Sequence, residues 1–479
     1  MRIVQLVILV SSVYNSIQSN DDELMKLLPE FFVNATRGIE PHPDAGKDIY
    51  QILHDHGYKA ESHWVTTEDG YVLRMQRIPN GKNLTDTGKS KPAVLLMHGM
   101  LSSSADWLIM GPNRSLAYML ADAGFDVWLG NNRGNTWSRN HLKLDPRVDA
   151  KEFWDFSFED CGHYDLPAKI DYIIATTGQD RIFYVGHSQG TSQYFAMASL
   201  RPEYNDKIAL MTALAPVAYM KHLASPLPRL AVKYMEAISL AADILKINEL
   251  LGHSELLSLA ARLACSDGSP FQEICATFLF FLCGFDSPEM ERNIIPVLAT
   301  NSPAGISTKM LKHYGQEIRS GFFRQYDYGG LQNLAKYNSL TPPSFNMSAA
   351  TAPVALYYSQ NDLFAAVEDV ERLANEMPNV VKKKLMKWKK FSHLDFILAK
   401  NIYCLLNRHV VDFMQEYLNR TSTTTSLPTT TTPSTSPTSS TSPTSPTSPT
   451  SPTSKPNSGY SNKSSILPLF VTMLLKIFL

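Results

Sequence analysis

One serine lies in a setting that would make it a nucleophile. Ser188 is the central residue of Gly186-His187-Ser188-Gln189-Gly190, a G-x-S-x-G motif between an apolar run at residues 182–185 and a helical pattern at residues 191–200. A sharp strand-to-helix turn lifts such a hydroxyl above a sheet, and the flanking glycines let the backbone crowd there. The helix N-terminus favours an anion at this point. We therefore predict that Ser188 is a nucleophile; the alternative is a structural turn.

A nucleophilic serine needs a general base, and the base needs an acid that orients it. Where the serine lies on such a turn, the acid and then the base follow it along the chain. Asp362 comes just after the strand-like run at residues 354–358, and His393 lies in a turn after residues 380–386. These two residues are the predicted acid and base. The other candidates lie at less suitable positions; they are His313 and His409 for the base and Glu368 and Asp369 for the acid.

Acyl transfer also needs two N–H groups that bind an oxyanion. The residue after the nucleophile supplies one, which makes the amide of Gln189 the first candidate. The other comes from the loop after the first long strand, at residues 97–101. There Gly99 permits a close approach, and the amide of Met100 is the second candidate. His98 in this loop precedes the nucleophile, so we interpret it as structural.

Elements that could position these residues follow from the hydrophobic pattern. A helix is predicted at residues 41–57 and two strands around an Asp-Gly turn at residues 64–73. Short apolar runs separated by helical patterns then predict a parallel sheet covered on both faces, within an α/β fold. The runs lie at residues 93–97, 125–129, 182–185, 208–214 and 354–358. Ligands bind beyond the carboxyl ends of such strands.

The pattern changes between residues 219 and 345. This stretch is rich in Leu, Ala, Met and Phe at helical spacing and has no clear strand run. It predicts a helical cap inserted into a core whose two parts are residues 40–218 and 346–420. Its most apolar segments, residues 230–245 and 274–285, could present a surface to lipid, although ordinary helical core is the plainer reading.

Composition and charge narrow the function classes. The 479 residues carry 44 Lys and Arg against 45 Asp and Glu, a net charge of −1 that argues against nucleic acid as the main partner. No Cys/His cluster has zinc spacing, so we predict no metal and no cofactor. A lysine-rich run reads as a charged edge strand that resists pairing, or as a basic rim on anionic lipid. Its members are Lys382, Lys383, Lys384, Lys387, Lys389 and Lys390.

Both ends of the chain have unusual composition. Residues 1–19 combine a charged start, a short apolar run and small residues, which predicts a secretory signal peptide rather than a buried helix. Residues 421–456, nearly all Ser, Thr and Pro at first, predict a mucin-like stalk. Residues 457–479 resemble a GPI-anchor signal with Asn457 as the attachment residue; the alternative is a secreted protein with an apolar end. Predicted N-glycosylation sites are Asn34, Asn83, Asn113, Asn346 and Asn419, with a further sequon at Asn462.

The five cysteines predict at most two disulfides. In an oxidising compartment an odd count leaves at least one thiol free. Cys265 and Cys275 flank a polar, turn-rich stretch and form the predicted bridge. Cys283 lies in an aromatic run and is predicted to be a buried thiol. No partner is assigned to Cys161 or Cys404.

Several motifs together resemble the acid lipase family, the group of gastric lipase and lysosomal acid lipase. The most specific are Asn132-Arg133-Gly134-Asn135-Thr136-Trp137-Ser138 and Gly186-His187-Ser188-Gln189-Gly190. Others lie at residues 65–71, 97–99, 156–158, 164–168, 361–362 and 392–396, and the likeness spans about residues 40 to 418. The Ser/Thr/Pro segment and the apolar end depart from the family pattern.

This resemblance implies an α/β-hydrolase with a helical cap, acting on triacylglycerols or sterol esters through an acyl-enzyme. Its triad falls on Ser188, Asp362 and His393, its oxyanion groups on Met100 and Gln189, and its cap disulfide is similar to Cys265–Cys275. The predicted partner is a lipid ester at a lipid–water interface. A carboxylesterase on shorter esters and a non-catalytic surface protein on a hydrolase scaffold are the alternatives. The predicted location is extracellular, with GPI anchoring, and the lysosome is the alternative.

Overall fold

The structure is a computed structural model of the chain. It describes residues 42–84, 90–252, 255–269 and 272–424. The predicted signal peptide, Asn34, Asn457, Asn462 and nearly all of the predicted stalk and anchor signal lie outside the described residues. Within them, no helix is both long enough and apolar enough to span a bilayer.

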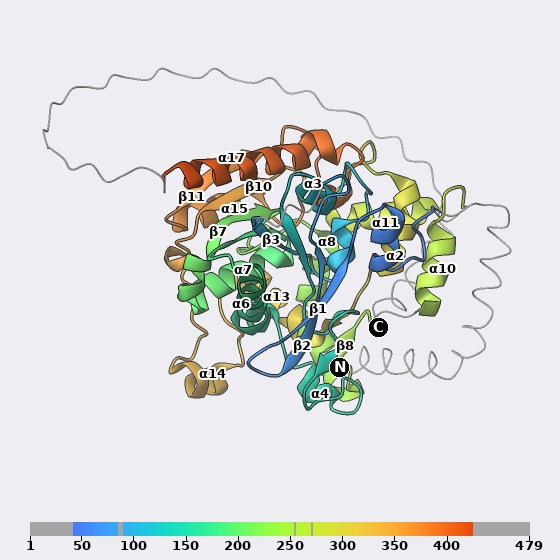
Figure 1. The fold of residues 1–479 in the computed structure, drawn as a ribbon. Helices are drawn as coiled ribbons and strands as arrows, with labels where there is room; N and C mark the ends of the chain where they lie inside the picture. The colour runs from blue at the N-terminus through green and yellow to red at the C-terminus, as the bar shows by residue number, and fades with distance from the viewer. Residues whose placement is uncertain (1–41, 85–89, 253–254, 270–271, 425–479) are drawn as a thin grey trace, which may run out of the picture. The chain divides into compact units, whose positions relative to one another are not determined.

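A nine-stranded, mostly parallel sheet forms the centre of the fold (Figure 1). Its strand order is β1-β2-β4-β3-β6-β7-β10-β11, and the short β5 pairs with β2. β1 and β2 pair antiparallel, as do β2 and β4, whereas all pairs from β4 to β11 are parallel. The strands are β1 (Glu61–Thr66), β2 (Tyr71–Ile78), β3 (Ala93–Met97), β4 (Asp126–Gly130), β5 (Asn140–His141), β6 (Ile182–His187), β7 (Ile208–Leu214), β10 (Val354–Tyr358) and β11 (Val380–Leu385).

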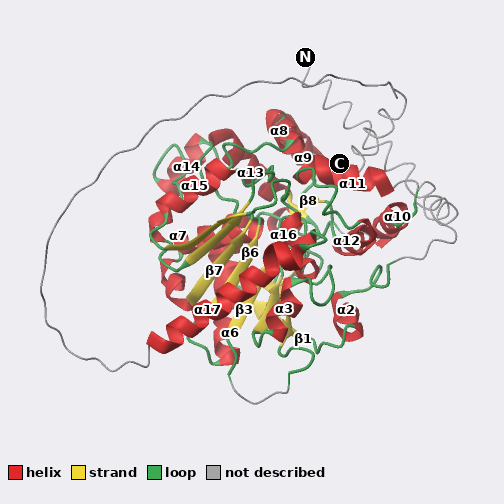
Figure 2. Cartoon of the chain, turned by 90° about the horizontal axis from the view of Figure 1, so that it is seen from above, coloured by secondary structure: helices red, strands yellow, loops and turns green. Residues whose placement is uncertain are grey.

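The central strands are buried along their whole length, and helices lie on both faces of the sheet (Figure 2). Two-sided burial explains why these strands appear in the sequence as continuous apolar runs. The core helices are α2 (Ile49–Asp55), α3 (Leu116–Asp122), α4 (Ala150–Phe153), α5 (Phe158–Asp160), α6 (Leu166–Thr177), α7 (Gln189–Leu200), α15 (Val367–Glu376), α16 (Asp395–Leu398) and α17 (Arg408–Thr424). The described residues up to Met414 form one compact unit, and α17 continues into a second unit that starts at Gln415.

The helix predicted at residues 41–57 is shorter than expected. Residues 43–46 form turns, with Gly46 at a φ of +86°, and α2 begins only at Ile49. Asp48 accounts for this start, because its carboxylate accepts a hydrogen bond from the Gln51 amide while the Gln51 side chain accepts one from the Asp48 amide. This reciprocal capping box satisfies two donors at the helix N-terminus.

The stretch between β7 and β10 is mainly helical. Its helices are α8 (Pro226–Lys233), α9 (Met235–Leu245), α10 (Glu255–Cys265), α11 (Gln272–Cys283), α12 (Ile295–Asn301), α13 (Thr308–Ser320) and α14 (Gly330–Tyr337). It also contains a two-stranded antiparallel sheet of β8 (Glu249–Leu250) and β9 (Ile306–Ser307). Two residues per strand are too few for a period-2 pattern, so the hydrophobic pattern did not predict this sheet.

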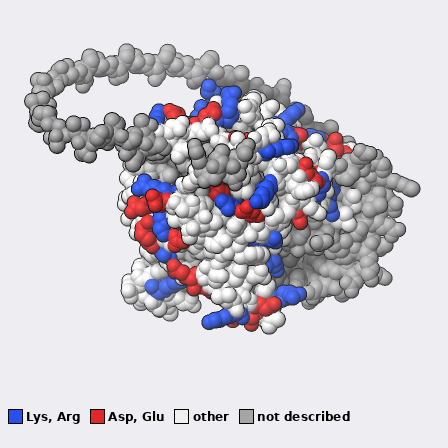
Figure 3. Space-filling view, viewed as in Figure 1, with Lys and Arg blue, Asp and Glu red and all other residues white. Residues whose placement is uncertain are grey.

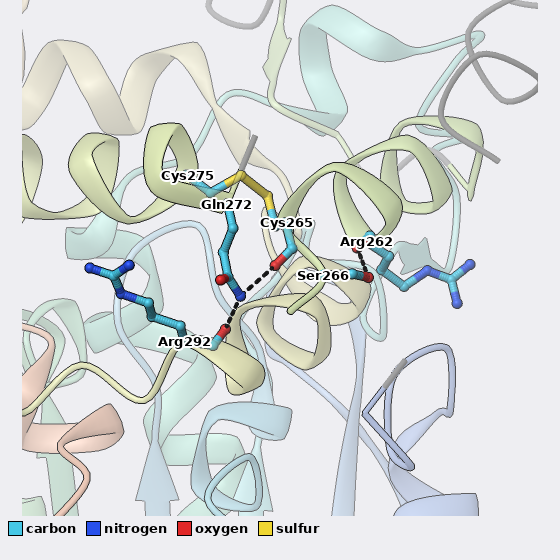
Figure 4. Close-up of a disulfide and its surroundings, with 6 residues drawn as sticks. All are labelled: Arg262, Cys265, Ser266, Gln272, Cys275 and Arg292. Atoms are coloured by element: carbon cyan, nitrogen blue, oxygen red, sulfur yellow. Dashed lines mark hydrogen bonds between the residues drawn. A yellow bond between two sulfur atoms is a disulfide. The ribbon is translucent and has the colours of Figure 1, made fainter. Parts of the chain in front are cut away.

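A disulfide between Cys265 and Cys275 joins α10 to α11 (Figure 4). The Gln272 side chain lies beside it and donates to the backbone carbonyl oxygens of Cys265 and Arg292, both at 3.4 Å. The remaining cysteines are free thiols; Cys161 and Cys283 are buried, as predicted for Cys283, and Cys404 is exposed.

Charges of both signs are interspersed on the face shown in Figure 3, as expected for a chain with almost no net charge. Asn83, Asn113, Asn346 and Asn419 are all exposed in the described residues. Their glycosylation stays a prediction.

Candidate active site

Ser188 lies on a strained turn between β6 and α7. Its φ of 52° and ψ of −116° fall in a region that few residues other than glycine adopt, and such strain concentrates at functional sites. Both glycines of the motif are required by close packing. A Cβ at Gly186 would lie 2.7 Å from the Gly190 carbonyl, and one at Gly190 would lie 2.2 Å from the Met97 carbonyl oxygen.

The structure brings Ser188, His393 and Asp362 into one hydrogen-bonded chain. The Ser188 hydroxyl donates to His393 Nε2 at 2.8 Å. On the other side of the ring, His393 Nδ1 lies 2.8 and 2.9 Å from the two carboxylate oxygens of Asp362. A ring that donates from Nδ1 keeps Nε2 free to accept a proton, which is the arrangement a general base needs.

Asp362 is held as a carboxylate by its surroundings. Its Oδ1 accepts hydrogen bonds from the amides of Phe364 and Ala365 at 2.8 and 2.9 Å. Burial alone would raise its pKa, but the charge and hydrogen bond of His393, together with these amides, outweigh burial and lower the pKa. The aspartate therefore stays ionised and can stabilise an imidazolium.

The two predicted oxyanion groups belong to segments that meet at Ser188. Gln189 is the first residue of α7, where N–H groups have no intrahelical acceptor. The loop that carries Met100 passes directly over the nucleophile, since a Cβ built on Gly99 would lie 3.4 Å from the Cβ of Ser188. The positions of both segments suit an oxyanion hole formed by the amides of Met100 and Gln189.

His98 holds this loop in place. Its Nδ1 donates to the Gly99 carbonyl oxygen at 2.8 Å, while its Nε2 accepts from the Asn132 amide at 3.3 Å and from the Asn135 side chain at 3.2 Å. Burial lowers its pKa to about 4, so the ring is neutral at pH 7. The two hydrogen bonds that Nε2 accepts require this neutral state. The position of His98 fits the structural role predicted for it.

Three motif segments converge on the buried side chain of Arg133. Its guanidinium makes contacts of 2.6 Å with Asp69 and with Asp165, and it stacks 4.0 Å from the centre of the Tyr71 ring. Asp69 and Tyr71 belong to the β1–β2 hairpin and Asp165 precedes α6. The cluster thus fixes the loop after β4, which carries the asparagines that hold His98.

His187 is a site residue that the sequence did not reveal. It is buried between the loop that carries Gly99 and the loop that carries His393. Its Nδ1 lies only 3.1 Å from the position that a Cβ on Gly99 would occupy. Its Nε2 donates to the backbone oxygen of His393 at 3.0 Å. Burial and the nearby His393 lower its pKa to about 3, which keeps it neutral. The only sequence signal was its place inside the G-x-S-x-G motif.

Asn361 and the end of α11 also support the triad, and neither role was predicted. The Asn361 side chain donates to the Phe285 carbonyl oxygen at 3.2 Å and to the Lys390 carbonyl oxygen at 2.6 Å. The His393 amide donates to the Cys283 carbonyl oxygen at 3.2 Å. The loops of the acid and the base therefore share one anchor, the segment that follows α11.

The rejected candidates serve elsewhere. His313 is buried on α13 and bonds Ser157, and Asp369 accepts from His222. His409 is half-buried near the start of α17. Among the described residues, no group of three or more His, Cys, Asp or Glu side chains is placed to hold a metal ion.

Comparison with known proteins places this arrangement in a family. Residues 49–111 match the family described as a partial alpha/beta-hydrolase lipase region, and residues 92–399 match the alpha/beta hydrolase fold. Lipase 3 of Drosophila melanogaster is 42% identical over 79% of this chain and 95% of its own length. Human lipase member K is 38% identical over 82% and 97%, and human gastric triacylglycerol lipase 38% over 78% and 92%.

The chain belongs to the acid lipase family. It is an α/β-hydrolase and a carboxylic ester hydrolase of the lipase type. Both family matches begin within the described residues and together cover the segments that carry Ser188, Asp362 and His393.

Proposed function

We propose that this chain hydrolyses neutral lipid esters, triacylglycerols or sterol esters, through an acyl-enzyme on Ser188. The observation that carries the proposal is the continuous hydrogen-bonded chain from Ser188 through His393 to Asp362. The names of relatives such as gastric triacylglycerol lipase support the substrate class.

The geometry suggests a standard order of steps. His393 Nε2 takes the proton of the Ser188 hydroxyl as its oxygen attacks the ester carbonyl, and Asp362 stabilises the resulting imidazolium. The amides of Met100 and Gln189 donate to the oxyanion of the tetrahedral intermediate. His393 then passes the proton to the leaving alcohol oxygen. Water repeats the sequence on the acyl-enzyme, which releases the fatty acid and restores the serine.

A lipid–water interface as the place of action is supported by the surface of the cap. Leu230, Tyr234, Ile238, Leu240 and Ile244 on and between α8 and α9 are all exposed. Apolar side chains that gather on adjacent helices usually mark an interaction surface. A dissolved short-chain ester would not require them, which favours a lipase over the carboxylesterase alternative.

Replacing Ser188 tests the chemistry. Ser188→Ala should lower kcat on emulsified triolein by about 10⁴-fold or more, because the attacking oxygen is lost. The parent protein should also react covalently with a fluorophosphonate probe, and the variant should not. A variant that keeps full activity, or a parent protein that the probe does not label, would show that the scaffold does not work as a serine hydrolase. Comparing triolein with a dissolved short-chain ester separates lipase from carboxylesterase.

We further propose that the protein is exported, which its predicted signal peptide and its sequons support. A GPI tether is the finer form of this proposal. Release of the protein from cells by phosphatidylinositol-specific phospholipase C would support it, and retention would contradict it.

A further inference from the structure

The lysine-rich run forms one edge of the central sheet. β11 is the last strand in the sheet order, and Lys382 and Lys384 lie on it. Lys387, Lys389 and Lys390 follow in the connection to His393, and all three are exposed. We call these five lysines the basic edge.

The start of α17 adds positive charge beside this edge. Lys382 Nζ lies 3.9 Å from the centre of the Phe413 ring. Burial and the positive charges of Arg408, Lys384 and Lys382 lower the pKa of His409, whereas the nearby Asp412 raises it. Arg408 is exposed, so it extends the basic edge across the surface.

Four lysines of the basic edge have no acidic partner among the residues that the structure describes. In the described part of the chain, Lys384, Lys387, Lys389 and Lys390 form no ion pair within 4 Å, although carboxylates do lie nearby. Glu371 on α15 is paired with Lys383, outside the basic edge. The carboxylates of Asp286 and Glu289 are buried. Asp286 accepts a hydrogen bond from Trp388, and Glu289 accepts from Asn401. Asp412 on α17 is exposed and lies near enough to His409 to raise its pKa.

Two exposed aromatic side chains lie among these cations. Trp388 is 37% exposed, and its indole N–H is fixed to Asp286 at 2.6 Å. Tyr403, which is 40% exposed, lies 6.0 Å from Arg408. Val381 and Leu385 are also exposed on β11, but side chains alternate along a strand, so these two lie on the face opposite Lys382 and Lys384. Tryptophan and tyrosine favour the headgroup level of a bilayer, and lysine favours anionic headgroups.

We propose that the basic edge binds a lipid surface that carries anionic headgroups. The proposal rests on the proposed lipase function and deepens it. It names a surface beside the triad that binds the lipid layer in which the substrate lies. Lys390 precedes His393 by only three residues, at the carboxyl end of β11. Two other readings compete with it: charge that only keeps an edge strand from pairing, and a site for an acidic polysaccharide. The exposed Trp388 and Tyr403 favour lipid.

Vesicle binding by a charge-neutralised variant tests the proposal. Full-length Lys384→Gln/Lys387→Gln/Lys389→Gln should partition about 100-fold less strongly onto phosphatidylcholine vesicles with about one third phosphatidylserine at low salt, at about fivefold per lysine. Lys59→Gln/Lys143→Gln/Lys151→Gln removes the same charge from exposed sites elsewhere and should bind like the parent. The parent should bind pure phosphatidylcholine weakly and lose the phosphatidylserine-dependent part at high salt.

Each other result overturns the proposal. Equal vesicle binding by the two triple variants would remove the role of the basic edge. A Lys384/Lys387/Lys389 variant that associates into oligomers, with unchanged vesicle binding, would assign the lysines to protection of the strand. Retention on heparin without binding to phosphatidylserine vesicles would assign the edge to polysaccharide. Binding is read without turnover, and hydrolysis of a dissolved ester is measured separately, so failure here is distinct from failure of the proposed hydrolase.

Discussion

At the scale of residues, the triad depends on side chains that take no part in the proposed chemistry. Asn361 directly precedes Asp362, and its amide group joins the segment after α11 to the loop that leads to His393. His187 ties the same loop to the region beneath Gly99. The loop that carries His393 is therefore held by hydrogen bonds to the backbone oxygens of Lys390 and of His393 itself.

Asn361→Asp tests this positioning role. The change preserves shape but replaces two N–H donors by an oxygen that repels the carbonyl groups of Phe285 and Lys390. We expect kcat on a dissolved ester to fall about 10-fold with little change in KM, because a small displacement of the base is costly while substrate contacts remain. Asn361→Gln should recover part of the activity if the donors are what matters. A rise in KM alone, or unchanged kinetics, would argue against positioning.

At the scale of elements, the Arg133 cluster joins three parts of the fold that are far apart in sequence. Asp69 lies in the β1–β2 turn, Arg133 follows β4 and Asp165 precedes α6. Burial would lower the pKa of Arg133, but the charges of Asp165 and Asp69 outweigh it and raise the pKa well above its usual value. The Arg133 guanidinium therefore keeps its positive charge beside the two carboxylates.

Arg133→Met should be strongly destabilising, since it removes the guanidinium that contacts the fully buried carboxylate of Asp165 and the partly exposed carboxylate of Asp69. We expect the free energy of unfolding to fall by about 3–5 kcal/mol, measured by urea denaturation. Arg147→Met is the matched control, because the Arg147 side chain is 88% exposed and lies 4.0 Å from Asp145. That variant should change stability by less than about 0.5 kcal/mol. Similar losses in both variants would mean that the cluster contributes little.

The sequence predicted the elements better than it predicted their contacts. β3, β7 and β10 have the predicted bounds because strands buried on both faces give unbroken apolar runs. The order of nucleophile, acid and base follows from topology, and the structure places Ser188, Asp362 and His393 together accordingly. The bond between His187 and His393 joins residues 206 positions apart, and no local pattern encodes such a pair. The β8–β9 sheet was missed because its strands are too short.

At the scale of the whole molecule, buried carboxyls and buried histidines have opposite effects on how stability depends on pH. Burial raises the pKa of Asp106, Glu159 and Asp395 to about 7, and the charge of Asp286 adds to the effect at Asp395. These carboxyls contribute stability below their unfolded pKa of about 4, and it is lost as pH rises through 7. Burial lowers the pKa of three histidines. Because their pKa in the unfolded chain is about 6.5, the stability that they contribute is lost as pH falls below about 6.5. They are His98, His187 and His313.

Between about pH 4 and 6.5 the carboxyls and the histidines change the free energy of unfolding in opposite directions. Above that range only the carboxyls still contribute to its pH dependence. We therefore expect the free energy of unfolding to fall between about pH 6.5 and 8, by roughly 0.8 kcal/mol per carboxyl. Asp395→Asn should reduce that fall, since its amide does not titrate while its oxygen can still accept from the Ser392 amide. Urea denaturation at several pH values measures the effect. Stability that is constant or rises from pH 6.5 to 8 would contradict it.

The separation of Ser188 and His393 along the chain also has a consequence for biosynthesis. They are 205 positions apart, with the entire helical insertion and β10 between them. A ribosome that has finished β6 and α7 has made the proposed nucleophile without its proposed base, and every product that stops before β11 lacks His393. Contacts between such distant segments form slowly in folding. Lipolysis can therefore begin only after nearly all of the sheet has been synthesised and assembled, which protects the lipids of the producing cell from partial chains.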